Sequence, residues 1–96
     1  MQADLIIISE YSRKSNIDPV FLLELDAENL IDIQIVDNEK YISVEQLPDL
    51  EKYIRWHYDL SLNVEGIDVV RNLLERIDTM QNEINELRNK LHIYGQ

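Results

Sequence analysis

The chain has 96 residues and no cysteine, and its 19 acidic residues against nine Lys and Arg give a net charge of −10. This length predicts one small domain with at most an added arm, and the lack of cysteine excludes disulfides and thiolate chemistry. No apolar run reaches the ~18 residues of a membrane-spanning helix and no signal peptide opens the chain, so we expect a cytoplasmic protein without a membrane partner.

The first elements are a short strand and a short helix. Residues 5–8 (LIII) are apolar and β-branched, which favours a strand. Ser9 is expected to cap a helix over residues 10–15, and Asn16 is expected to end it. Ile17 is then expected to return to the core.

A second helix is predicted to start at Asp18 and Pro19. Asp18 has a side-chain acceptor suited to an N-cap, and Pro19 suits the first helical turn, where its missing N–H is not needed. The helix is expected to run from residue 20 to about residue 28, with Asn29 as a left-handed stop. Three apolar residues are expected on its inner side: Phe21, Leu22 and Leu25.

Residues 30–42 predict a two-stranded wing. Residues 30–36 (LIDIQIV) alternate imperfectly, residues 37–39 (DNE) supply a turn, and residues 40–42 (KYI) return as a second strand. Ser43 and Gln46 have the spacing of a capping box at the start of a third helix. That helix is expected to reach about residue 58, with its regular part beginning near Pro48, because proline would cost an early hydrogen bond.

The last third of the chain predicts one long helix. Asn63 is a natural N-cap, no proline follows it before Tyr94, and the only glycine in that span is Gly66 in the first turn. Apolar residues occupy every a and d position of a heptad repeat: Val70, Leu73, Ile77, Met80, Ile84, Leu87, Leu91 and Tyr94. Such a helix spans roughly 45 Å at about 1.5 Å per residue, more than so small a domain covers.

We therefore expect residues 1–62 to form a domain and residues 63–96 a helix that leaves it, the two being one structural unit. The first turns should pack on the domain, and the rest should meet a second copy of the chain. The expected dimer interface consists of Leu73, Ile77, Met80, Ile84, Leu87, Leu91 and Tyr94. The alternative is a helix packed wholly on its own domain.

The expected order of elements resembles that of a known family of domains. The order is strand, helix, turn, helix, wing, helix and long helix. The stretch IIISEYSRKSNIDPVFLLELDAENLI resembles the opening of MerR-like winged helix-turn-helix domains, and YISVEQLPDLEKYIRWHYDLSLNVEGIDVV resembles the part that follows. The block DLSLNVEGIDVVRNLLERIDTMQNEINELRNKL is most similar to one branch, the chaperone-modulator CbpM family. The resemblance covers residues 5–94. It implies a mainly α fold, a MerR-like winged helix-turn-helix with a small β wing and a long C-terminal coiled-coil helix.

The resemblance also implies a function. CbpM-like proteins are non-enzymatic regulators of the bacterial cytoplasm that bind the J-domain of a DnaJ-like co-chaperone (CbpA type), inhibit its co-chaperone activity and suppress its DNA binding. MerR-like dimers imply an antiparallel pair of C-terminal helices, whereas Ile and Val at a with Leu and Met at d suit a parallel pair.

The sequence departs from the family pattern at two positions. Glycine is usual where this chain has Asn29, and a third aliphatic residue is expected where Asn72 precedes two leucines.

The charge of the second helix and the wing argues against direct nucleic acid binding. Residues 16–39 contain seven acidic residues and no Lys or Arg. A DNA-reading surface needs cations that displace counterions from phosphates, so this segment would repel DNA and attract a basic protein surface. J-domains as a class present a basic helix to their chaperone. An acidic face that binds this helix would compete with the chaperone for it. The plain alternative is that the acidity only keeps the protein soluble.

Two groups of residues are candidate partner contacts. One consists of the acids Glu24, Asp26, Glu28 and Asp32. The other is Arg55 with Trp56, because an aromatic residue beside an arginine is typical of an interface anchor, although Trp56 also suits the core.

No catalytic, cofactor or metal site is expected, because the chain has no Ser/His/Asp set with a supporting turn, no phosphate-binding glycine loop and no metal-ligand spacing. The alternative functions are a MerR-type DNA-binding transcriptional regulator and a structural assembly module acting through the C-terminal helix.

Overall fold

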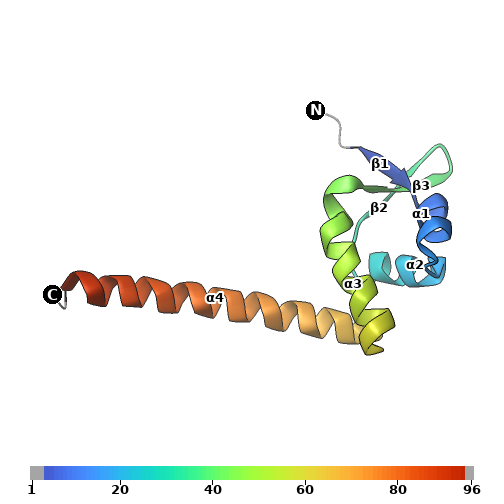
Figure 1. Cartoon of the computed structure of the whole chain (residues 1–96). Helices are drawn as coiled ribbons and strands as arrows, with labels where there is room; N and C mark the ends of the chain where they lie inside the picture. Colours follow the sequence, from blue (N-terminus) through green and yellow to red (C-terminus); the bar gives the residue numbers. More distant parts are fainter. Residues whose placement is uncertain (1–3, 95–96) are drawn as a thin grey trace.

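A computed structural model describes residues 4–94, with side chains to residue 92. The elements in chain order are β1 (Leu5–Ile7), α1 (Ile8–Ser15), α2 (Pro19–Ala27), β2 (Ile33–Val36), β3 (Glu39–Ser43), a 3-10 turn (Val44–Gln46), α3 (Leu47–Leu60) and α4 (Val64–Tyr94). The first three helices and the sheet form a small body, and α4 leaves it as a straight arm (Figure 1). The predicted order of elements is confirmed, and the fold is mainly helical with a small β wing.

The sheet is antiparallel, with β3 between β1 and β2. Ile42 of β3 is fully buried and lies opposite Ile6 on one side and Ile33 on the other, so one face of the sheet is aliphatic and packs on the core. Asp37 and Asn38 join β2 to β3 with φ values of 51° and 66°. Two consecutive left-handed residues make the tight hairpin turn that matches strand twist, which confirms the predicted wing.

The second strand is shorter than predicted. It begins at Ile33, whereas Leu30 and Ile31 are buried in the connection that leads to it. Asn29 turns the chain with a φ of 60°, as expected of a left-handed stop, and sends the next two side chains straight into the core. Apolar character at residues 30 and 31 therefore reflects burial and not strand pairing.

The prediction that Ser9 caps the first helix is wrong. β1 runs directly into α1, which begins at Ile8 and has Ile7 as its N-cap with no side-chain hydrogen bond. Ile8 is buried, so packing of the helix start replaces a polar cap. Asn16 ends α1 in the left-handed conformation, with a φ of 55°, as predicted.

The start of α2 follows the prediction. The Asp18 carboxylate accepts a hydrogen bond from the Val20 N–H at 2.9 Å, and Pro19 occupies the first turn. The Asp18 N–H in turn donates to the Tyr58 hydroxyl at 3.0 Å, which ties the start of α2 to the end of α3. This contact and the stacking of Phe21 on His57, with ring centroids 4.1 Å apart, fix α2 against α3.

The capping box predicted at Ser43 and Gln46 is wrong, because Gln46 bonds a more distant segment. The Asp32 N–H donates to Gln46 Oε1 at 2.7 Å, and Gln46 Nε2 donates to the Asp32 carbonyl at 3.0 Å. Gln46 Nε2 also donates to Ser43 Oγ at 3.0 Å. The side-chain amide thus pairs with the backbone at the entry to the wing and fastens it to the start of α3, whose regular part begins beside Pro48 as predicted.

Replacing Gln46 with Glu should destabilise the fold by about 1–3 kcal/mol, because the new carboxylate oxygen would face the Asp32 carbonyl and lose two donated bonds. The measurement is the free energy of unfolding in urea. The matched control is Gln34→Glu, the same change at an exposed position on β2. Equal and small effects of the two substitutions would show that the Gln46 bonds do not stabilise the wing.

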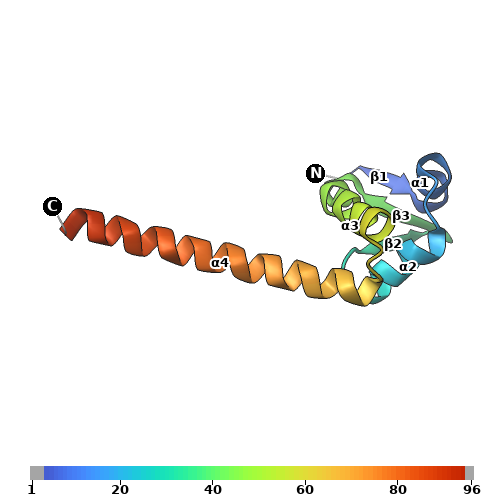
Figure 2. The same cartoon turned by 60° about the horizontal axis from the view of Figure 1, so that its bottom comes forward.

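The base of α4 is anchored in the body. Ile67 is fully buried and Val64 nearly so. Asn63 Oδ1 accepts a hydrogen bond from the Gly66 N–H at 2.8 Å, which confirms the predicted N-cap. Beyond Val70, which is half-buried, and Arg71, every described side chain of α4 is exposed, and the arm extends away from the body in both views (Figures 1 and 2).

Candidate protein-interaction surfaces

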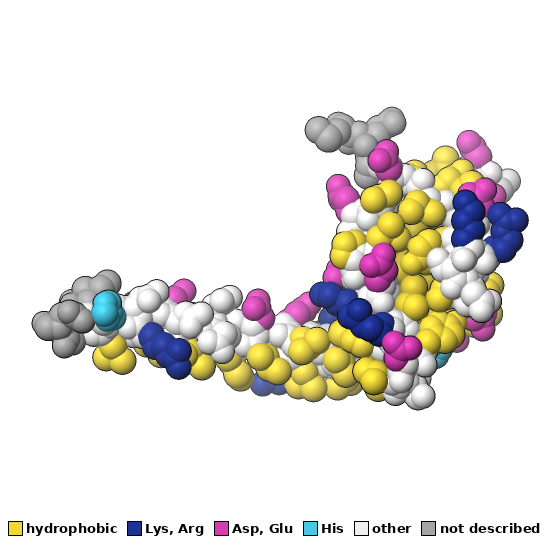
Figure 3. Space-filling model, viewed as in Figure 1, with side chains coloured by type: hydrophobic (Ala, Val, Ile, Leu, Met, Phe, Trp, Pro, Cys, Tyr) yellow, Lys and Arg dark blue, Asp and Glu magenta, His cyan; other side chains and the backbone are white. Residues whose placement is uncertain are grey.

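The arm carries an uncovered apolar row, which we call the α4 stripe. Its residues are between 43% and 71% exposed: Leu73, Ile77, Met80, Ile84, Leu87 and Leu91. Figure 3 shows these apolar side chains gathered along one edge of the arm. The remaining predicted interface residue, Tyr94, has a helical backbone, and its side chain lies outside the described part. Six large apolar side chains in a heptad row are a surface that a second helix covers well.

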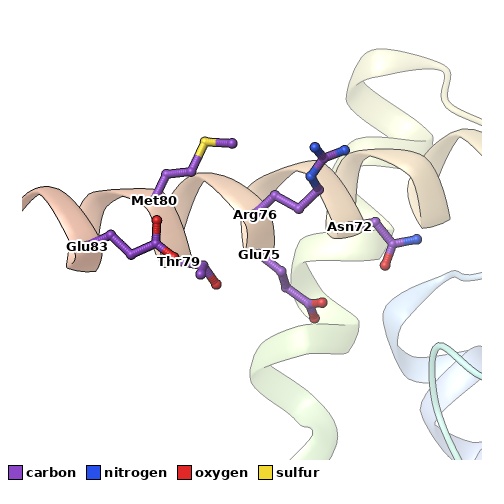
Figure 4. A pocket seen from close by; sticks show the side chains of 6 residues that line it. All are labelled: Asn72, Glu75, Arg76, Thr79, Met80 and Glu83. Atoms are coloured by element: carbon purple, nitrogen blue, oxygen red, sulfur yellow. The ribbon is translucent and has the colours of Figure 1, made fainter.

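A shallow hollow lies beside the α4 stripe. Figure 4 shows its lining, which comes from α4 alone: Asn72, Glu75, Arg76, Thr79, Met80 and Glu83. A small molecule there would touch one wall only, whereas ligand sites surround most of their ligand. The hollow therefore belongs to the flank of the arm, where the side of a neighbouring helix would lie.

The four predicted acidic contacts differ in their surroundings. Glu24, Glu28 and Asp32 are exposed, and within residues 4–94 they form no ion pair. Asp26 is half-buried, and its carboxylate accepts the Ile33 N–H at 2.9 Å, so it holds the wing entry in place. Three of the four acids are therefore open to a partner, and Asp26 has a structural role as well.

α2 has an exposed apolar face that the sequence interpretation missed. Val20 is 55% exposed, Leu23 is 38% exposed, and Ala27 is also exposed. The opposite side of the helix is buried, as predicted: Phe21, Leu22 and Leu25. The signal was present in the sequence, because the helix PVFLLELDA is apolar on both sides while only one side can face the core.

The structure separates the other predicted pair, Arg55 and Trp56. Arg55 is exposed, whereas Trp56 is half-buried against the core, with its ring centroid 5.9 Å from that of Tyr53.

Trp56 and Tyr53 line a hollow in the corner between α3 and α4, together with Arg71. Burial raises the pKa of Tyr53, and the Arg71 guanidinium partly opposes this rise. Within the described part of the chain, no ion pair or hydrogen bond links this corner to Glu24 or the other acids of α2.

The described residues lack two other kinds of site. Between residues 4 and 94, no group of three or more histidines and acids is arranged to hold a metal ion. No helix in the same part of the chain combines the length and the apolar character that a bilayer-spanning segment needs.

These features define a winged helix-turn-helix protein with a long C-terminal helix and an acidic second helix. The chain matches the family described as MerR HTH family regulatory protein over residues 6–89, and it belongs to that family. Neither the curated proteins nor the solved structures include a match to the chain.

Proposed function

We propose that the protein is a non-enzymatic regulator of the bacterial cytoplasm that binds the J-domain of a DnaJ-like co-chaperone and inhibits its co-chaperone activity. The observation that carries this proposal is the character of α2 and the wing. In a DNA-reading relative of this fold, these elements would approach phosphates, yet residues 16–39 contain seven acids and no Lys or Arg. The sequence resemblance to the CbpM branch supports the choice of a J-domain as the partner.

The chemistry of the acidic face supports a competitive mechanism. Glu24 on α2 and Glu28 at its C-cap lie about one helical turn apart, exposed and without a counter-ion among the described residues, and Asp32 is exposed at the wing entry. A partner helix rich in Lys and Arg would gain ion pairs here at little desolvation cost, since no internal ion pair must break. A J-domain bound through its basic helix could not present that helix to its chaperone.

The electrostatics disfavour DNA as the ligand of this surface. A protein gains affinity for a duplex chiefly by placing cations on phosphates, and each exposed acid near the backbone adds repulsion instead. Arg13 and Lys14 on α1 and Lys40 on β3 flank the segment of residues 16–39 in the sequence, but none lies on the exposed side of α2. The proposed regulator therefore acts on a protein and not on nucleic acid.

We also propose that the α4 stripe joins two copies of the chain. The flanking charges fit either direction of pairing. In a parallel pair, Glu83 of one copy would lie near Arg88 of the other, and in an antiparallel pair with Ile77 opposite Met80, Arg76 would lie near Glu83. Neither register places like charges side by side, and both cover the exposed apolar row.

Reversing the charge at Glu24 and Glu28 to Lys should weaken J-domain binding roughly ten- to thirtyfold, because each of the two exposed contacts is worth at most ~1 kcal/mol. Most of the loss should appear in a slower association rate, and wild-type affinity should fall as salt rises, since exposed charges act mainly on encounter. The measurement is a kinetic binding titration against the J-domain of the organism's DnaJ-like co-chaperone at two salt concentrations.

The matched control is Glu65→Lys with Glu86→Lys, which changes the net charge equally on α4. Circular dichroism checks that both double variants stay folded. Affinity that ignores salt and the α2 reversal would move the contact elsewhere, with the corner at Trp56 as the next candidate. No binding of the J-domain by the wild-type protein would overturn the proposed function.

A further inference from the structure

The outer side of α2 is apolar at its centre and acidic at its edges. With about 100° of rotation per residue, Val20, Leu23 and Ala27 fall within about 60° of one another and form one row along the helix. Glu24 and Glu28 lie along one edge of this row. Beyond the other edge lies Asp26, which is hydrogen-bonded to the wing entry that includes Asp32. We call the row and its acids the α2 face.

The α2 face is not needed by the fold of the body. The core takes its contribution from the opposite side of the helix, where Leu22 and Leu25 are fully buried. On the outer side, Val20 and Leu23 leave aliphatic surface in water next to carboxylates that have no partner cation in the described residues. An aliphatic row with charged edges is the pattern of a contact surface with a dry centre and a polar rim.

We propose that the α2 face is the docking surface for an amphipathic helix that carries an aliphatic row between Lys and Arg residues. The argument for this occupant is complementarity, since aliphatic side chains would cover Val20 and Leu23 while cations on either side would meet Glu24, Glu28 and Asp32. The identity of the natural partner as the basic helix of a J-domain rests on the proposed function. The chemistry of the occupant rests on the α2 face alone.

The acids and the aliphatic side chains of the α2 face should affect different rate constants, and this difference tests the proposal. Exposed acids steer the encounter, so they govern the association rate, whereas the covered aliphatic side chains resist separation and govern the dissociation rate. Val20→Ser with Leu23→Ser should therefore raise the dissociation rate by roughly tenfold or more and leave the association rate nearly unchanged. This is the opposite of the kinetic effect expected from reversing Glu24 and Glu28.

The experiment uses the full chain and two probes. One probe is the J-domain of the organism's DnaJ-like co-chaperone, and the other is a synthetic helix with leucines in one row and lysines on both sides. A peptide with glutamates in place of the lysines is the negative probe. The matched control variant is Ile35→Ser with Leu60→Ser, which removes two aliphatic side chains that are 68% and 63% exposed on the wing and on α3. Val20→Ser alone serves if the double variant loses its circular dichroism signal.

The outcomes separate this proposal from the proposed function. The expected result is that both basic probes bind the wild type and the control variant and dissociate faster from the α2 variant. J-domain binding that the α2 variant leaves unchanged would overturn the α2 face and keep the proposed function. Binding of the lysine peptide at α2 without any J-domain binding would keep the α2 face and overturn the proposed function. Failure of both basic probes, or equal binding of the glutamate peptide, would overturn the α2 face.

Discussion

Replacing Ile84 with Asp should convert the protein from a dimer into a monomer at micromolar concentration. Ile84 lies in the middle of the α4 stripe and is 43% exposed in the single chain. In a pair of helices it would face the partner, and the substitution would bury two unpaired carboxylates in a dry interface. A cost of several kcal/mol lowers the dimer affinity by about a thousandfold or more. Sedimentation velocity across a concentration series measures the change.

The control is Asn82→Asp, which adds the same charge on the exposed back of α4, and it should leave the dimer intact. The monomeric variant should also lose helical signal in circular dichroism, because a helix of about 20 residues without tertiary contacts is marginal in water. A wild-type protein that sediments as a monomer would refute the role assigned to the α4 stripe.

Replacing Ile67 with Ala should destabilise the body by about 2–5 kcal/mol, the usual range for truncating a fully buried aliphatic side chain. Ile67 is the main buried contact of α4, so the cavity would open at the base of the arm and loosen its anchoring. The free energy of unfolding should be measured in the Ile84→Asp background, since the proposed dimerisation would make apparent stability depend on concentration. Loss of that much free energy is a large fraction of the stability of a domain this small.

Leu60→Ala is the matched control for Ile67→Ala, because it removes the same number of atoms from a side chain that is 63% exposed. It should cost only a few tenths of a kcal/mol, as exposed substitutions usually do. A small effect of Ile67→Ala, equal to that of the control, would mean that α4 is not held by its buried first turns.

The local signals in the sequence predicted much of the fold because they act over a few residues. Asp18 with Pro19 started α2, Asn16 and Asn29 adopted the left-handed conformation, and Asn63 capped α4. The capping box failed for the opposite reason. Gln46 has hydrogen-bonding partners both three and 14 residues away, and spacing along the chain does not reveal the Asp32 backbone that the fold brings beside it.

The exposed apolar surfaces were predicted unevenly. The heptad spacing indicated which residues of α4 share a row, and the structure leaves that row uncovered from Leu73 to Leu91. The outer side of α2 was missed, because the helix has large apolar residues on both sides and only those assigned to the core, Phe21, Leu22 and Leu25, were considered. Val20 and Leu23 became recognisable as surface residues only when their exposure was known.

The short connection between α3 and α4 fixes the orientation of α4 relative to the body. His57 Nδ1 donates to the Leu62 carbonyl at 2.7 Å, and the Leu62 N–H donates to the Trp56 carbonyl at 3.2 Å. Two hydrogen bonds from Leu62 to α3 therefore span the left-handed residue Ser61. In a dimer joined through α4, the paired helices would then hold the two acidic faces at a fixed distance from each other, which a flexible linker would not do. A partner that is itself dimeric would be gripped at two points, and the second contact would form at high effective concentration. Two weak contacts would in this way give a long-lived complex, and they would favour partners whose two binding sites have the matching spacing.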